Sequence, residues 1–149
     1  MKKTYSIKPA DIARTWFEID ASTASLGKVA AEAAKLLLGK GKPQFSAHID
    51  CGDYVIITNA SKIVVTGKKL EQKRYYRHSG YPGGLHTRTL AEQLEIDPTK
   101  VIFTAVRGML PNNKLLDERL KRLKIYIASE HAHAPQQPVV LKLAKGNLN

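Results

Sequence analysis

Hydrophobic residues recur along the chain with two different spacings, and the order of these spacings predicts the fold class. Residues 15–20 form a short apolar run that is typical of a strand. Over residues 26–37 the apolar positions recur with helical spacing instead, which predicts a helix closed by Gly39. Residues 54–58 form a continuous β-branched run, as expected for a strand that is covered on both faces.

The second half of the chain alternates in the same way. A β-branched run over residues 63–66 predicts a further strand, and residues 89–94 predict a short amphipathic helix. Asp97 followed by Pro98 marks the start of a longer helix, because proline is favoured at the first helical position. Pro111 is expected to end that helix.

A last helix is predicted from Asn113, followed by a strand or extended segment over residues 124–128. The leucines of this helix are expected to face inward and its cations outward: Leu116, Leu120 and Leu123 inward, with Lys114, Lys121 and Arg122 outward. From Ser129 onward the sequence predicts an irregular tail lying along the surface.

The order strand, helix, strand makes a right-handed crossover the expected connection. We therefore predict an α/β fold with a small, mostly parallel sheet. The length of 149 residues and the 43% hydrophobic content suit a single domain spanning residues 1–149. It is expected to comprise a core over about residues 15–128, an extended basic loop over residues 68–88 and a C-terminal tail over residues 129–149.

The net charge of the chain indicates which class of molecule it binds. The chain carries 24 Lys and Arg against 13 Asp and Glu, a formal charge of +11, which favours a polyanion. We find no apolar run of membrane-spanning length, no lipidation motif and no signal peptide, so we expect a cytoplasmic protein without a membrane partner. The single cysteine excludes an intrachain disulfide and a multi-cysteine zinc site.

The basic loop over residues 68–88 has the composition of a nucleic-acid contact. Cations neutralise phosphates, while tyrosine and histidine rings offer flat faces to unpaired bases. We expect the loop to become ordered only against a polyanion; a solvated hairpin tip is the alternative. The residues concerned are Lys68, Lys69, Lys73, Arg74, Tyr75, Tyr76, Arg77, His78, Tyr81, His86 and Arg88.

Further cations are candidate phosphate contacts outside that loop. The Gly39 to Lys42 run either ends a helix with solvated lysines or contacts a phosphate, and the sequence leaves both readings open. Arg107 at a helix end either satisfies terminal carbonyls or binds RNA; its neighbour Gly108, which permits close backbone approach, and the family resemblance described below favour RNA. The full set outside the loop is Lys40, Lys42, Arg107, Lys114, Arg119, Lys121 and Arg122.

No catalytic or metal-binding constellation is identified, and no cofactor or small-molecule substrate is expected. A lone thiol without a partnered base is normally a small buried side chain, and two histidines alone do not complete a metal site. The residues weighed and set aside are His48, Asp50, Cys51, Asp53, Asp117, Glu118, His131 and His133.

Five segments together resemble a known family. Residues 35–43, 48–59, 75–85, 106–111 and 131–138 are similar, in order and spacing, to the bacterial-type large-subunit ribosomal protein thirteen family. The resemblance covers nearly the whole chain, from about Thr15 to Pro138. It implies a three-layer α/β/α fold around a four-stranded parallel sheet.

The same resemblance implies a function. Family membership would make the chain a non-enzymatic, ribosome-bound component that binds large-subunit ribosomal RNA early in assembly, beside neighbouring large-subunit ribosomal proteins. It maps the family's basic loop onto residues 68–88 and its signature helix end onto residues 107–111. Three alternatives remain: a non-ribosomal protein that binds structured RNA, an enzyme acting on nucleotides or RNA, and a DNA-binding architectural protein.

Overall fold

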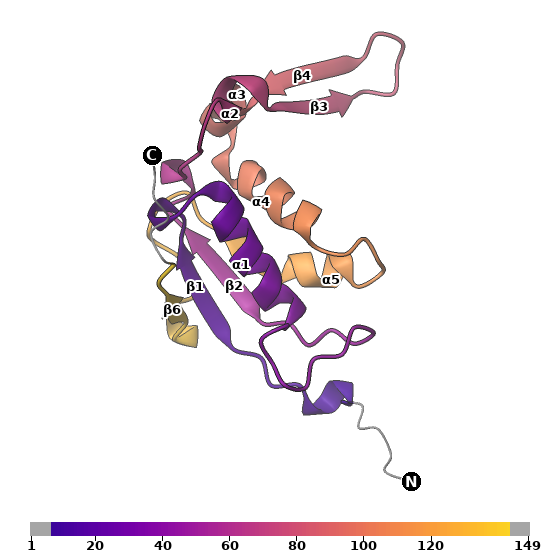
Figure 1. Cartoon of the computed structure of the whole chain (residues 1–149), viewed down its shortest axis with the longest axis vertical. Coiled ribbons are helices and arrows are strands. Elements are labelled where there is room, and N and C mark those ends of the chain that lie inside the picture. The colour runs from indigo at the N-terminus through magenta and orange to yellow at the C-terminus, as the bar shows by residue number, and fades with distance from the viewer. Residues whose placement is uncertain (1–6, 144–149) are drawn as a thin grey trace.

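A four-stranded parallel sheet lies at the centre of the computed structural model, which describes residues 7–143 (Figure 1). The strand order is β5-β2-β1-β6, with β1 paired to β2 and β6, and β2 paired to β5. The strands are β1 (Trp16–Asp20), β2 (Tyr54–Thr58), β5 (Leu123–Ile125) and β6 (Val139–Leu141). The expected α/β class with a small parallel sheet is confirmed.

Two long helices cover one face of this sheet. They are α1 (Leu26–Leu38) and α4 (Pro98–Met109), which pack against each other. The expected start of α4 is confirmed: the Asp97 carboxylate accepts hydrogen bonds from the backbone N–H groups of Thr99 and Lys100, at 3.0 and 3.2 Å. The shorter elements are η1 (Pro9–Asp11), η2 (Ala21–Thr23), η3 (Ala60–Lys62), α2 (Lys69–Gln72), α3 (Leu90–Ile96), α5 (Leu116–Lys121) and η4 (Ala134–Gln136).

The core lies between this helix pair and the sheet. Strand residues alternate between the two faces, so Ile19 of β1 and its register partner Ile57 of β2 both face the helices. Both are fully buried, together with Val29 and Leu37 of α1 and Ile102 of α4. These contacts fix the position of α4 against α1 and the sheet.

The C-terminal tail covers the other face of the sheet. Trp16 stacks on Tyr54 at 4.2 Å between ring centroids, and His133 from the tail lies 4.9 Å from Trp16. His131 Nε2 lies 3.5 Å from a carboxylate oxygen of Glu18. The two tail histidines, interpreted from the sequence as ordinary polar or RNA-facing residues, therefore attach the tail to the sheet.

The tail also supplies β6, so the expectation of an irregular tail is wrong over Val139–Leu141. Only three residues long, this strand carries little local signal and forms through its pairing with β1. The strand expected over residues 63–66 is wrong as well. That segment makes a single bridge, between Val64 and Ser25. Leu123 lies in β5 rather than on the last helix.

No helix in the described range 7–143 is long and apolar enough to cross a membrane.

Gly52 lies where two backbone segments approach each other closely. A Cβ atom at this position would be 1.8 Å from the carbonyl oxygen of Leu37. Gly52→Ala is therefore expected to lower the free energy of unfolding by about 1–3 kcal/mol, measured by urea denaturation. Gly41→Ala is the matched control, because an added Cβ there meets no atom within 4 Å. Equal stability of the two variants would contradict the close approach.

Candidate nucleic-acid interface

The basic segment forms a hairpin rather than an irregular loop. Strands β3 (Arg74–His78) and β4 (Leu85–Thr89) pair in antiparallel fashion and project from the end of the molecule that carries α2 and α3 (Figure 1). The Ser79 N–H donates to the Gly84 carbonyl at 3.0 Å and closes the turn. Gly80 and Gly83 have φ of +90° and +74°, a conformation that favours glycine. The segment is thus held together by backbone hydrogen bonds of its own.

One face of the hairpin looks toward helices α3 and α4. The register pairs Tyr75 with Arg88 and Arg77 with His86, and strand alternation places these four side chains on one face. All four line a recess of about 450 Å³, to which α4 contributes Lys100. Sequence reasoning missed Lys100, because its contact with this set is tertiary and leaves no local signal.

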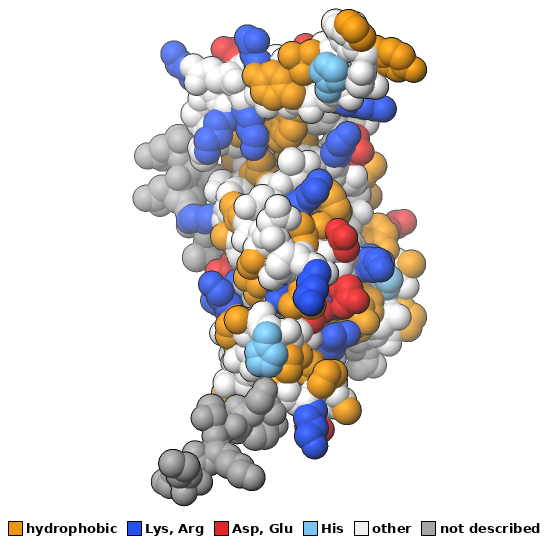
Figure 2. Space-filling view, turned by 90° about the vertical axis from the view of Figure 1, so that its right-hand side faces the viewer, with side chains coloured by type: hydrophobic (Ala, Val, Ile, Leu, Met, Phe, Trp, Pro, Cys, Tyr) orange, Lys and Arg blue, Asp and Glu red, His pale blue; other side chains and the backbone are white. Residues whose placement is uncertain are grey.

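The opposite face of the hairpin looks toward solvent. It carries Tyr76, His78 and Leu85, and Tyr81 lies at the tip. Tyr76 is 67% exposed and Tyr81 is 76% exposed. Exposed rings of this kind beside cations provide stacking faces for unpaired bases. Figure 2 shows this end of the molecule with hydrophobic, histidine and cationic side chains gathered together.

The three loop tyrosines are not equivalent. Tyr75 packs against the hydrophobic core, and the Lys73 Nζ atom lies 5.4 Å from its ring centroid. The Tyr75 hydroxyl is buried without a hydrogen-bond partner among the described residues, and burial raises its pKa. We therefore reassign Tyr75 from base stacking to packing, and keep Tyr76 and Tyr81 as stacking candidates.

Most of the proposed polar contacts to RNA are accessible. Those of the basic segment are gathered at the hairpin end: Lys68, Lys69, Lys73, Arg74, Arg77, His78, His86 and Arg88 are all exposed. Lys40, Arg107, Lys114 and Lys121 are also exposed, but they lie outside the hairpin. Lys and Arg side chains are scattered down the face drawn in Figure 2, with Asp and Glu between them. The hairpin end is therefore the clearest candidate interface.

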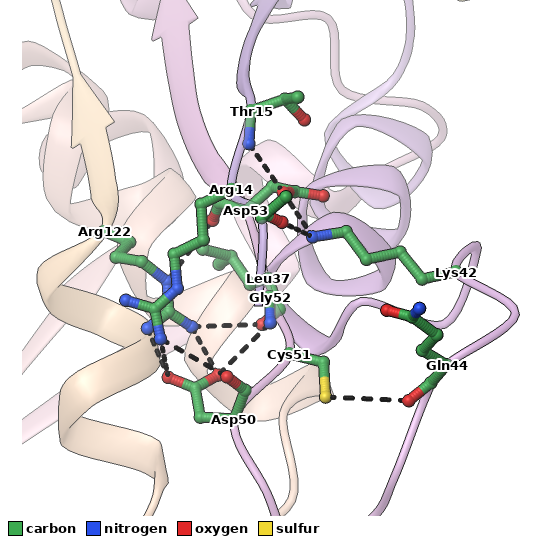
Figure 3. Close-up of polar contacts among 11 residues, drawn as sticks. Arg14, Thr15, Leu37, Lys42, Gln44, Asp50, Cys51, Gly52, Asp53 and Arg122 are labelled. Atoms are coloured by element: carbon green, nitrogen blue, oxygen red, sulfur yellow. Dashed lines mark hydrogen bonds and ion pairs between the residues drawn. The ribbon is translucent and has the colours of Figure 1, made fainter. Parts of the chain in front are cut away.

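Arg119 and Arg122, both expected to contact phosphates, are buried, and the expectation that Arg122 faces outward is wrong. Their exposed fractions are 1% and 5%. Arg122 donates to both carboxylate oxygens of Asp50, with Nη2 2.6 Å from Oδ1 (Figure 3). Arg119 Nε lies 3.6 Å from Asp50 Oδ1, and Arg14 Nη2 lies 3.8 Å from Oδ2. We no longer assign phosphate contacts to Arg119 and Arg122.

The error has a physical source. Helix α5 is only six residues long and ends before Arg122, so a helical projection does not give that side chain's direction. Asp50, set aside on sequence grounds as a catalytic or metal-binding residue, has a structural role. Its carboxylate is the acceptor at the centre of a buried arginine cluster, defined here as Arg14, Asp50, Arg119 and Arg122.

Lys42 is also engaged within the protein. Its Nζ atom donates to Asp53 Oδ1 and to the Ala13 carbonyl, each at 2.7 Å. Asp53 Oδ1 additionally accepts from the Thr15 N–H at 2.9 Å. Lys42 therefore fastens the segment before β2 to the segment before β1, which replaces the phosphate contact expected of it. Lys40 remains exposed.

A family model and the relatives found by sequence comparison all point to the same protein family. A family model described as "Ribosomal protein L13" matches residues 14–132. The large ribosomal subunit protein uL13 of Neisseria meningitidis is 52% identical over 141 residues, which cover 95% of this chain and 99% of that protein. The protein of the same name from Dehalococcoides mccartyi is 55% identical over 139 residues, covering 93% and 97%. That of Kocuria rhizophila is 52% identical over 136 residues, covering 91% and 92%.

Proposed function

The chain belongs to the ribosomal protein L13 family, and from this premise we propose that it binds large-subunit ribosomal RNA early in assembly and stabilises its folded state. The family is structural and not enzymatic, and its members are located in the cytoplasmic ribosome of bacteria. Neighbouring large-subunit proteins are the further partners that we propose. The whole chain, residues 1–149, is proposed to act as one domain.

The observation that carries this proposal is the hairpin end. Exposed cations occur there together with the exposed rings of Tyr76 and Tyr81, and α3, which packs against α4, contacts both strands of the hairpin. Phosphate contacts made by the cations set the position of the protein on RNA without reading sequence. Stacking on the two exposed rings then selects an RNA surface that presents unpaired bases.

Binding to protein-free RNA tests this function. The full chain should bind large-subunit ribosomal RNA more tightly than small-subunit ribosomal RNA or duplex DNA at the same salt concentration. Because no other protein is present, such binding would also support an early role in assembly. Equal affinity for the two ribosomal RNAs would favour a general structured-RNA binder, and equal affinity for DNA would favour an architectural protein.

Lys114 and Lys121 are expected to act through charge alone. Replacing both with alanine should weaken binding almost equally for all RNA sequences. The slope of log affinity against log salt concentration should fall in magnitude by about one for each lost phosphate contact. Both side chains are exposed, so the melting temperature should not change. Filter binding over a series of salt concentrations measures the slope. An unchanged slope would remove the two lysines from the interface.

A further inference from the structure

Two recesses meet above helix α4 at Thr104. The first has a volume of about 450 Å³ and lies between the inner face of the hairpin and α4. The second has a volume of about 470 Å³ and lies between α2, α4 and the first turn of α1. Thr104 lines both recesses, so they lie next to each other along α4, and we call the two together the α4 groove.

The charges along the α4 groove have one sign. Its lining includes five Lys and Arg side chains, and no Asp or Glu is found among the described residues that line it. The cations are Arg77, Arg88 and Lys100 in the first recess, and Lys69 and Lys73 in the second. Concave surfaces lined by one sign of charge concentrate ligands of the opposite sign.

The second recess also offers apolar contact. Leu26, Val65, Ala105 and Met109 line it, and Met109 is exposed. An added Cβ atom at Gly27 or Gly108, on either side of this recess, would meet no atom within 4 Å. The groove therefore combines cations with an open, partly apolar surface.

We propose that the α4 groove holds an unpaired segment of RNA, with Lys100 and Thr104 among its contacts. This inference rests on the proposed function and specifies the form of RNA that the site binds. A positively charged groove that follows the sugar–phosphate backbone is the usual arrangement for single strands. A duplex presents paired bases and a rigid outline, so its bases would not enter recesses of this size.

An acidic peptide from a neighbouring protein would match the charge but not the rest of the surface. Tyr76, an exposed ring that suits stacking on a base, is among the residues that line the first recess, and the chain as a whole has a formal charge of +11. These observations favour RNA. Binding of a peptide is treated below as an outcome that overturns the proposal.

Tethered cleavage tests which molecule occupies the groove. An iron chelate that generates hydroxyl radicals would be attached to the full-length Thr104→Cys variant. The labelled protein would then be bound to large-subunit ribosomal RNA. Cys51 is buried and does not compete for the reagent. Ala10→Cys is the matched control, because Ala10 is exposed and belongs to η1, which lies at the opposite end of the molecule from the hairpin (Figure 1). We expect cuts at unpaired nucleotides that only the chelate at position 104 produces.

The other outcomes of cleavage are equally informative. Loss of RNA binding with the chelate at position 104 alone, in a variant of unchanged melting temperature, would also support an occupied groove. Cuts confined to duplex RNA, the same weak cuts from both positions, or cleavage of a neighbouring protein in assembled subunits instead of RNA would overturn the proposal.

A charge variant gives an independent readout. Lys100→Ala should weaken RNA binding by about threefold to tenfold near physiological salt, since one phosphate contact is lost. Lys8→Ala removes an exposed lysine outside the groove and should have less effect. Equal binding by the two variants would overturn the groove while leaving the proposed function intact. Failure of the unmodified chain to bind large-subunit RNA would instead overturn the proposed function.

Discussion

Asp50→Asn is expected to lower the free energy of unfolding by about 3–5 kcal/mol, because it removes the negative partner from a buried arginine cluster. Arg122 and Arg119 are almost fully buried and would remain as uncompensated charges. Asparagine keeps the size of the side chain, so the effect reports charge rather than packing. Asp117→Asn, at an exposed position on α5, is the control and should change stability by less than about 0.5 kcal/mol.

The same cluster should make the free energy of unfolding depend on pH in the acid range. Burial alone would raise the pKa of Asp50, but the hydrogen bonds and charge of Arg122, with the Gly52 N–H and Arg14, hold it below its ordinary value. The cluster therefore contributes stability above the pKa of an unfolded aspartate, about 3.9, and loses it as pH falls through the lower folded-state pKa.

Urea denaturation at neutral pH and near pH 3 tests both statements. The difference in stability between the unmodified chain and Asp50→Asn should shrink as the pH is lowered, because the unfolded aspartate takes up a proton below about pH 3.9 while the folded carboxylate does so only at lower pH. A difference that stays constant over this range, or a fully stable Asp50→Asn variant at neutral pH, would contradict the role assigned to the cluster.

Replacing Tyr76 and Tyr81 with leucine is expected to reduce discrimination between large-subunit ribosomal RNA and unrelated RNA. The double variant keeps every cation and retains apolar bulk, but it removes two exposed aromatic faces. The cost should be about 1–3 kcal/mol for each ring that stacks on a base, with nonspecific affinity nearly unchanged. Competition binding at fixed salt concentration measures the discrimination.

Tyr75→Leu serves as the structural comparison. Tyr75 packs on the core, so this variant should lower the melting temperature and leave RNA preference unchanged once the folded fraction is taken into account. The Tyr76 and Tyr81 double variant should melt like the unmodified chain. If the double variant is destabilised and still discriminates between RNAs, stacking does not select the site.

Local signals were sufficient to predict much of the core. The spacing from Leu26 to Leu37 predicted α1, and Asp97 with Pro98 predicted the start of α4, because helix periodicity and capping are encoded by neighbouring residues. The runs at β1 and β2 were predicted for the same reason. The composition of the basic segment singled out the residues that form the hairpin end.

The remaining features depend on contacts between distant residues. Nothing near Arg122 in the sequence indicates Asp50, which lies 72 positions earlier and accepts its hydrogen bonds. Lys100 joins the hairpin residues only because α4 packs beneath them. Strand β6 needs β1 as its partner. Charge alone therefore did not distinguish an exposed arginine from a buried one.

Sedimentation of a tagged copy from cell lysate tests whether the chain binds ribosomal RNA in the cell. We expect the unmodified chain to migrate with large ribosomal subunits and to remain with them in moderately high salt. The Tyr76 and Tyr81 double variant should be displaced from large subunits at lower salt than the unmodified chain. A chain found only at the top of the gradient as free protein, or equally on both subunits, would contradict the account.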